Sequence, residues 1–380
     1  MKILHICLAC SYTEGLSYQD NILANQNAAD GHEVMVISDC TRYVDGKIVP
    51  TPPEDMILSN GIRLVRLPFD FLFAGFLSNK IRKTKLLKPL INKFSPDVIF
   101  FHGCYGREIL TVARYKQKNP HIKLYADCHA EITNSGRKWL SLNILHKLIY
   151  KRWIHKALPQ IDKVFCISPE CRDFAENVYG IDPAVLEDYP LGGTVLEEKD
   201  RLRLRIETRE KYGLKDDHIV FLHAGKLDSL KKTLELIDIF YKVPSKRLKL
   251  LIAGSVSNDI LEEFQQRLNA DNRIQALGWV SGEELNRLFC ACDIYVQPGK
   301  VSQNAQNAIC CGTPVILADH DNNKKLIARN GWLIHNVEEM LLIFQKISER
   351  QSVLEPMSKA SFQIAKEKLD CRMLAARLYK

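Results

Sequence analysis

Short apolar stretches alternate with longer amphipathic segments through the first half of the chain. Strands are predicted at 2–8, 33–38, 62–67, 97–101, 123–127 and 163–167. Helices are predicted between them, at 18–30, 80–94, 106–118, 140–157 and 170–179. Strands that alternate with helices in this way favour a parallel sheet covered by helices on both faces.

The same alternation restarts in the second half. Strands are predicted at 219–223, 248–253, 274–277, 293–296, 315–317 and 331–334, and helices at 197–212, 233–242, 259–269, 282–291, 304–311 and from 337 onward. We therefore expect an α/β protein with two Rossmann-like, doubly wound domains that face a cleft. The expected bounds are 1–195 for the first domain, 196–360 for the second, and 361–380 for a C-terminal helix that packs back on the first. Ligands of such sheets bind beyond the carboxyl ends of the strands, so the cleft is the expected site.

Composition places the chain among soluble globular proteins, with 46% hydrophobic and 26% charged residues. It has no run of eighteen apolar residues, and residues 1–8 are expected to form a buried strand rather than a signal peptide. Twelve cysteines are present. Cys7 and Cys10 have the spacing of a redox pair, but buried free thiols in a reducing cytoplasm are the favoured interpretation.

The net charge of +8 is concentrated in the segment 66–94. Its basic residues are Arg66, Lys80, Arg82, Lys83, Lys85, Lys88 and Lys93, and its large apolar residues are Leu67, Phe69, Phe71, Leu72, Phe73, Phe76 and Leu77. Aromatic residues followed by a basic helix suit an anionic membrane surface or a lipid-linked substrate. A solvated helix face over core aromatics is the alternative. No nucleic-acid motif accompanies the charge, so nucleic acid is not expected as a partner.

The run from Pro298 to Ile316 is the most informative part of the sequence. It predicts a short polar loop after a strand, then a helix from about Gln303, then a Gly-Thr-Pro turn and another strand. Unpaired N–H groups at the start of a helix favour an anion, and a sugar nucleotide diphosphate would fit there. Ser302, Gln303 and Asn304 are the residues expected to contact it. The alternative is an ordinary strand-to-helix turn.

A second loop, Gly225 to Lys232, follows the strand predicted at 219–223. Gly225 would permit a close backbone approach at the strand end. Lys226 and Lys231 are predicted to converge on a diphosphate, where point charges in a water-poor cleft would stabilise a leaving phosphate. Surface lysines in a loop are the alternative, which the pair of loops together makes less favourable.

Four motifs in the second half resemble those of the family-4 retaining glycosyltransferases, which have the GT-B fold. They are Gly225-Lys226-Leu227 with Lys231, Gly278-Trp279-Val280-Ser281, Cys292-Asp293-Ile294, and Pro298 with Asn307-Ala308-Ile309-Cys310-Cys311-Gly312-Thr313-Pro314-Val315. The first half is similar to the family in Met1-Lys2-Ile3-Leu4-His5-Ile6, Gly31-His32-Glu33-Val34, Asp127-Cys128-His129 and Ile167-Ser168-Pro169. The resemblance therefore covers essentially the whole chain.

The resemblance also implies roles for individual residues. His129 would face the donor sugar, Gly15 would let the first loop approach the diphosphate, and Val280 would lie near the base. The sequence departs from the family where a glutamate usually contacts the ribose, because Asn307 stands there. Lys226 replaces the usual arginine, and the loop 299–304 is shorter than the common form, without the first of two paired glutamates.

The resemblance implies sugar transfer from a nucleotide-diphosphate-sugar to a glycan or lipid-linked acceptor, with retention at the anomeric carbon. A hexosyltransferase of surface polysaccharide or lipid-linked oligosaccharide assembly is the expected activity, in the cytoplasm and at the inner face of the membrane. No Asp-x-Asp motif is present, so neither a metal ion nor another cofactor is expected. The alternatives are a non-catalytic GT-B binding protein and a GT-B sugar-nucleotide epimerase. A dinucleotide dehydrogenase is disfavoured because no Gly-x-Gly-x-x-Gly follows a strand.

Overall fold

The computed structural model describes residues 1–44, 47–71 and 75–379, and contacts within the chain divide it into two units. The first unit contains Met1–Glu14, Gln19–Pro190 and Arg372–Lys380, and the second contains Gly15–Tyr18 and Leu191–Cys371. The chain thus leaves the first unit a few residues before the expected boundary at 195. Only its last residues return to the first unit, since 361–371 belong to the second.

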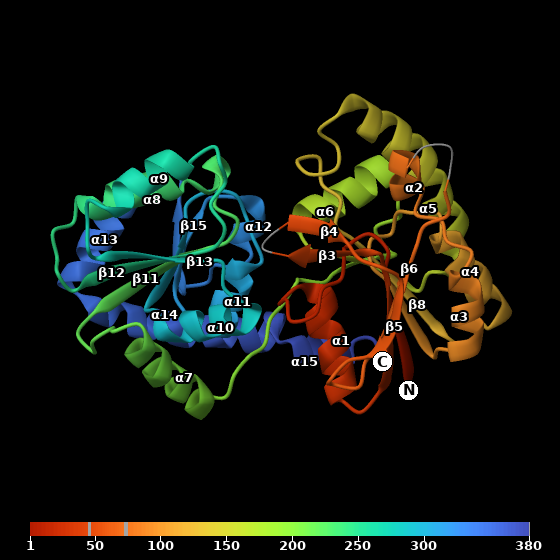
Figure 1. The fold of residues 1–380 in the computed structure, drawn as a ribbon, viewed down its shortest axis with the longest axis horizontal. Helices are drawn as coiled ribbons and strands as arrows, with labels where there is room; N and C mark the ends of the chain where they lie inside the picture. The colour runs from red at the N-terminus through yellow and green to blue at the C-terminus, as the bar shows by residue number, and fades with distance from the viewer. Residues whose placement is uncertain (45–46, 72–74, 380) are drawn as a thin grey trace. The chain divides into compact units, whose positions relative to one another are not determined.

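A predominantly parallel sheet forms the centre of the first unit (Figure 1). Its strand order is β10-β9-β8-β7-β1-β2-β6-β5, and only β5 runs antiparallel to its neighbour. The strands are β1 Lys2–Cys7, β2 Glu33–Asp39, β5 Glu54–Ile57, β6 Arg63–Leu67, β7 Val98–Phe101, β8 Lys123–Cys128, β9 Lys163–Cys166 and β10 Leu186–Asp188. A separate hairpin pairs β3, Thr41–Val44, with β4, Lys47–Pro50. The sequence pattern missed β3, β4, β5 and β10, which are short and mostly half-exposed.

Helices cover both faces of this sheet. They are α1 Gln19–Ala29, α2 Gly75–Ile81, α3 Leu87–Phe94, α4 Ile109–Lys118, α5 Lys151–Ala157, α6 Pro169–Phe174 and α15 Cys371–Ala376, with π-helical turns at Ser141–Tyr150 and Ala175–Tyr179. One core lies under α3 to α6, around Ile6, Phe101 and Leu124. On the other face Leu23 of α1 and Leu374 of α15 pack against β1 and β7, which places the end of the chain beside its beginning (Figure 1).

The second unit contains a parallel sheet of order β13-β12-β11-β14-β15-β16. Its strands are β11 Ile219–Ala224, β12 Leu248–Ala253, β13 Ile274–Gly278, β14 Ile294–Gln297, β15 Val315–Ala318 and β16 Gly331–Ile334. Its helices are α7 Glu198–Lys211, α8 Thr233–Tyr241, α9 Leu261–Leu268, α10 Gly282–Ala291, α11 Asn304–Cys310, α12 Asp321–Lys324, α13 Glu339–Glu349 and α14 Leu354–Ile364. Two cores, one on each face, are centred on Tyr295 and on Phe221. The expected fold class, two α/β domains with parallel sheets, is confirmed.

The prediction of one helix over 80–94 is wrong. The chain forms α2, then turns at Arg82, whose φ of 53° lies in the left-handed region, and begins α3 only at Leu87. Arg66, which was expected to belong to a basic surface, is buried at 1% exposure between the carboxylates of Glu14 and Glu54. An arginine taken out of water needs such partners. Lys80, Lys85, Lys88 and Lys93 are exposed, and Leu72 and Phe73 lie outside the described residues.

Within the described ranges, no helix is long and apolar enough to cross a membrane.

Candidate functional site

Lys231 is a buried cation of the second unit. It ends a 3-10 turn, Ser229–Lys231, beyond the carboxyl end of β11, and its side chain is only 6% exposed. Its Nζ donates to the main-chain oxygen of Lys300 at 2.8 Å. Burial lowers the pKa of Lys231 from 10.5 to about 8, because a desolvated ammonium is less stable than in water. The amine is therefore mostly charged at neutral pH although it is buried.

The loops that flank Lys231 approach each other closely. A Cβ placed on Gly299 would lie 2.2 Å from the oxygen of Leu230, so only glycine fits at this position. Gly225 has a φ of 140°, a conformation that side chains rarely adopt. A Cβ on Gly225 would lie within 3.8 Å of Lys231 and 3.7 Å of Asn304. Gly225, Lys231 and Asn304 therefore lie close together. Lys226, which was expected to converge with Lys231, is exposed in this structure.

The residues predicted at the start of the next helix are fixed by side-chain hydrogen bonds. Asn304 donates from Nδ2 to the oxygen of Ala224 at 3.1 Å, which joins α11 to the end of β11. The hydroxyl of Ser302 accepts from the main-chain N–H of Asn304 at 3.3 Å. Gln303 donates from Nε2 to the oxygen of Ser17 at 2.8 Å. The structure thus brings Ser302, Gln303 and Asn304 to the same edge of the sheet as Lys231.

The short segment Gly15–Tyr18 groups with the second unit although it lies early in the chain. Gly15 has a φ of 78°, and its missing side chain faces open space. Nearby, a Cβ on Gly282 would lie 2.3 Å from the hydroxyl oxygen of Ser17. The loop that carries Gly15 therefore contacts the start of α10 as well as Gln303.

Val280 and Asn307, the other two residues expected at the donor site, both pack within the second unit. Val280 is half-buried against the core of the second unit, just before Ser281, whose hydroxyl accepts from the N–H of Glu284 at 3.2 Å and begins α10. Asn307 is buried at 5% exposure in α11. A Cβ on Gly193 would come within 2.9 Å of its Oδ1, so Asn307 packs against the segment that enters the second unit.

His129 follows β8 in the first unit, and its side chain is one-third exposed. Its Nε2 lies 3.2 Å from Oδ2 of Asp127, which is fully buried. Burial would lower the pKa of His129, but the charge and hydrogen bond of Asp127 outweigh it and raise the pKa. Burial alone would raise the pKa of Asp127, but the charges of His129 and His102 hold this pKa well below its usual range. His129 is thus a protonatable group held by a carboxylate.

Two histidines missed by the sequence analysis belong to the same cluster. His102 follows β7, and its Nδ1 lies 2.9 Å from Oδ2 of Asp127. His5 lies in β1, and its Nδ1 lies 3.0 Å from Nε2 of His102. Strands β1, β7 and β8 are neighbours in the sheet, which brings the three side chains together. The signal available in the sequence was a histidine in or directly after each of two buried strands.

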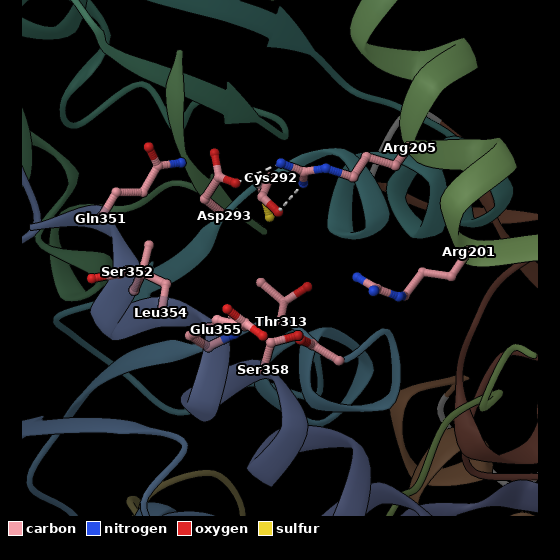
Figure 2. Close-up of a pocket in the computed structure, with 12 residues that line it drawn as sticks. Arg201, Arg205, Cys292, Asp293, Thr313, Gln351, Ser352, Leu354, Glu355 and Ser358 are labelled. Carbon is pink, nitrogen blue, oxygen red and sulfur yellow. Dashed lines mark hydrogen bonds and ion pairs between the residues drawn. The ribbon is translucent and has the colours of Figure 1, made fainter. Parts of the chain in front are cut away.

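A separate cavity of about 380 Å³ lies at the amino ends of the strands of the second sheet, whereas Lys231 and Asn304 lie beyond the carboxyl ends. Its lining includes Asp293 and Thr313, which precede β14 and β15, and Arg201 and Arg205 from α7 (Figure 2). Arg205 is paired with Asp293 at 2.6 Å. The predicted donor residues follow the carboxyl ends of β11 and β14, so this cavity is distinct from them.

Comparison with known proteins identifies the class of the chain. Residues 22–187 match the family Glycosyltransferase Family 4, and residues 205–361 match Glycosyl transferases group 1. The structure resembles sucrose-phosphate synthase from Thermosynechococcus elongatus, with 16% identity, coverage of 100% of this chain and 97% of that one, and a TM-score of 0.72. It also resembles Anabaena HepE, solved in complex with UDP and glucose, with 16% identity, coverage of 100% and 98%, and a TM-score of 0.68. At these identities the two structures show the fold.

A curated relative supports the same class over a shorter stretch. An uncharacterized glycosyltransferase of Methanocaldococcus jannaschii is 31% identical over 119 residues, which are 30% of this chain and 30% of the relative. The aligned stretch is thus less than a third of that relative. Taken with the two domain matches, the chain carries both domains of a GT-B glycosyltransferase.

Proposed function

We propose that the protein transfers a sugar from a nucleotide-diphosphate-sugar to a hydroxyl of a glycan or lipid-linked acceptor. The two glycosyltransferase domains support the reaction class. The UDP and glucose bound in the similar Anabaena structure support a sugar nucleotide as the donor.

The observation that carries this proposal is the position of Lys231. A buried ammonium costs free energy, and a protein retains one where an anion repays that cost. Lys231 lies beside Gly225 and Asn304, beyond the carboxyl end of β11, where open α/β sheets bind ligands. A diphosphate bound there would gain a charge-assisted hydrogen bond, and the leaving nucleoside diphosphate would be stabilised as its charge develops.

The remaining chemistry follows from the same arrangement. With Lys231 supplying positive charge, the leaving diphosphate takes the proton of the acceptor hydroxyl on the face it leaves, and the anomeric configuration is retained. His129 contacts the donor sugar as a hydrogen-bond donor. No metal ion is required in this scheme, because the ammonium of Lys231 supplies charge that a divalent cation would otherwise provide.

A thermal-shift panel of UDP, GDP, ADP and their sugar conjugates tests donor binding. A ligand that binds only the folded state raises the melting temperature. We expect one nucleotide to raise it in the parent and in Lys246→Met, an exposed lysine of the same unit, but not in Lys231→Met. No shift from any nucleotide in the parent would overturn the donor site.

Release of nucleoside diphosphate then separates an enzyme from a binding protein. The conjugate that shifts the melting temperature is incubated with the parent, and the free nucleoside diphosphate is quantified against Lys231→Met. Turnover in the parent alone supports transfer or donor hydrolysis at this site. Binding without turnover, with every acceptor class supplied, identifies a non-catalytic GT-B protein, and recovery of an isomerised sugar nucleotide identifies an epimerase.

A further inference from the structure

A continuous series of hydrogen bonds connects His129 to the molecular surface through the first unit. We call it the histidine relay, and its members are Asp30, Tyr379, Asn27, His5, His102, Asp127 and His129. Except for the last link, from Asp127 in β8 to His129 just after it, each link joins residues distant in sequence. The other members lie in or just after α1, at the end of the chain after α15, in β1 and directly after β7. Neither the family resemblance nor the proposed function assigns a role to its outer members.

The outer end of the relay determines which group donates and which accepts in each of its hydrogen bonds. Asp30 is exposed, and its ionised carboxylate can only accept hydrogen bonds. The hydroxyl of Tyr379 therefore donates its single hydrogen to Oδ2 of Asp30, at 3.0 Å. The hydroxyl oxygen is then left to accept, and it accepts from Nδ2 of Asn27 at 2.5 Å. Consequently the other atom of that amide, Oδ1 of Asn27, faces His5.

The orientation of the Asn27 amide determines which nitrogen of His5, in the interior, carries a proton. Its Nε2 lies 2.7 Å from Oδ1 of Asn27, an acceptor, so Nε2 carries the proton. Burial, reinforced by the charge of His102, lowers the pKa of His5 to about 3, and the ring therefore holds only one proton. Its Nδ1 is then an acceptor, and this nitrogen faces Nε2 of His102 at 3.0 Å.

The proton count at His102 follows. Nε2 must donate to His5, and Nδ1 must donate to the carboxylate of Asp127 at 2.9 Å, so both ring nitrogens carry protons. His102 is then an imidazolium paired with Asp127, and its ring lies against that of Phe100 with centroids 4.2 Å apart and an interplanar angle of 34°. Asp127 also accepts from the N–H of Gly103 at 2.5 Å and from His129.

We propose that Tyr379, Asn27 and His5 are positioning residues that keep His102 doubly protonated, so that Asp127 is charge-balanced and His129 is held in one protonation and hydrogen-bonding state. This rests on the proposed function only in that His129 is the residue assigned to the donor sugar. The protonation of His102 decides how strongly the negative charge of Asp127 acts on His129. An imidazolium at His102 offsets part of that charge, whereas with a neutral His102 the full charge of Asp127 acts on His129.

Two further acidic groups act on the pKa of His129 besides Asp127. Asp20, at the start of α1, is buried and its pKa is raised by burial, and Glu131 lies two residues further along the chain. Both carboxylates raise the pKa of His129 in their ionised forms. Loss of the positive charge on His102 would add to their effect, so the pKa of His129 would rise by on the order of one pH unit.

The test removes one hydroxyl at the far end of the relay. In Tyr379→Phe the amide of Asn27 can turn over, His5 can donate from Nδ1, and His102 then needs only one proton. We expect long-range ¹H–¹⁵N spectra of ¹⁵N-histidine-labelled full-length protein, in buffer with EDTA and without donor, to show Nε2 of His102 unprotonated. The titration of His129, assigned with His129→Asn, should move upward by on the order of one pH unit.

Tyr189→Phe is the matched control, because its hydroxyl donates to the oxygen of Leu374 at 2.7 Å and anchors the same C-terminal segment outside the relay. It should leave both readouts as in the parent. Asp30→Ala is a second variant, at an exposed position, that removes the acceptor of the Tyr379 hydroxyl and should move both readouts in the same direction as Tyr379→Phe. Unchanged tautomers and titration in both Tyr379→Phe and Asp30→Ala, or equal changes in Tyr189→Phe, would overturn the proposal.

These spectra need no substrate, so the relay and the proposed function fail separately. If the parent transfers sugar, the pH profile of kcat should move upward in Tyr379→Phe with KM nearly constant. A parent that lacks transfer activity but shows the tautomer change would retain the relay and lose the transferase proposal.

Discussion

The amine of Lys231 and the main-chain oxygen of Lys300 lie 2.8 Å apart, and this hydrogen bond joins the loop after β11 to the loop after β14. The same oxygen accepts from Nε2 of Gln297 at 2.5 Å. This acceptor does not neutralise the charge of the amine, because a carbonyl oxygen carries only a partial charge. Lys231 is thus positioned but not ion-paired by this contact, which is the state expected of a residue that awaits an anion.

Lys231→Met should stabilise the protein at pH 7 while abolishing its response to nucleotide. The folded protein releases the Lys231 proton near pH 8, and the unfolded chain holds it to about 10.5. Below pH 8 the cost of the buried charge is fully present, and it is relieved as the pH rises from 8 to 10.5. We expect the variant to be more stable by about 2 kcal/mol at pH 7, after allowing about 1 kcal/mol for the lost hydrogen bond.

Urea unfolding at pH 7 and pH 10 checks this difference. The gap between variant and parent should narrow at pH 10, since the amine of the folded parent is then neutral. A variant less stable than the parent at pH 7 would contradict the assignment of Lys231 as a costly buried cation. Nucleotide binding by the parent should weaken through pH 8 to 9 for the same reason.

Gly299→Ala should displace the loop that holds Lys231. The added Cβ would lie 2.2 Å from the oxygen of Leu230 and 2.8 Å from Cα of Lys231, so the backbone must move. Overpacking of this kind costs about 1 to 3 kcal/mol. We expect at least a tenfold loss of nucleotide affinity by titration calorimetry, because Lys231 moves with the loop. Lys300→Arg, which keeps the charge that acts on Lys231 and changes only an exposed side chain at the next residue, should leave the affinity within about twofold.

Arg209 should be a purely structural arginine. It is buried at 5% exposure, and it donates to the oxygen of Ala291 at 3.0 Å and to that of His218 at 2.8 Å. Arg209→Met leaves these oxygens and Asp293 short of donors and should cost about 3 kcal/mol in urea unfolding. Arg203→Met, on the exposed side of the same helix, should cost less than about 0.5 kcal/mol. Neither substitution should change the nucleotide specificity found in the thermal-shift panel.

The extent to which the sequence predicts this molecule differs between the fold and the site. Periodic apolar patterns located most of the long helices and the central strands, because burial of one face sets the period. They could not reveal that Arg66 pairs with Glu14 and Glu54, since this partnership depends on how distant loops pack. The turn at Arg82 was equally invisible, because a left-handed residue there has no glycine to mark it.

For the site, sequence motifs singled out Lys231 and Asn304, which the structure places beyond β11 and β14 at one edge of the second sheet, and His129, which follows β8 in the first unit. They did not locate His5 and His102, whose importance arises from the neighbouring order of β1, β7 and β8. The role of Tyr379 could not be predicted from the sequence either, because its hydroxyl reaches Asn27 only through the return of the chain to the first unit. Chemistry carried by a local motif is predictable, whereas chemistry carried by strand order is not.

The exposed lysines in α2, in α3 and in the segment between them should bind anionic membranes. Lys80, Lys85, Lys88 and Lys93 are exposed, and Phe71 near them is 77% exposed, a combination suited to a lipid surface. Each lysine near such a surface contributes about 1 kcal/mol at low salt. Arg66 contributes nothing, because it is buried between two acids.

Co-sedimentation with vesicles tests this. A variant with Lys85, Lys88 and Lys93 all changed to glutamine should lose at least tenfold in affinity for vesicles containing phosphatidylglycerol. The parent should bind vesicles that contain phosphatidylglycerol and should dissociate from them as the salt concentration is raised. It should not bind vesicles of phosphatidylcholine alone. A second triple variant, at Lys242, Lys246 and Lys249 in the other unit, lowers the net charge equally and should bind as the parent does. Equal losses in the two variants would mean that net charge, rather than this segment, attracts the protein to lipid.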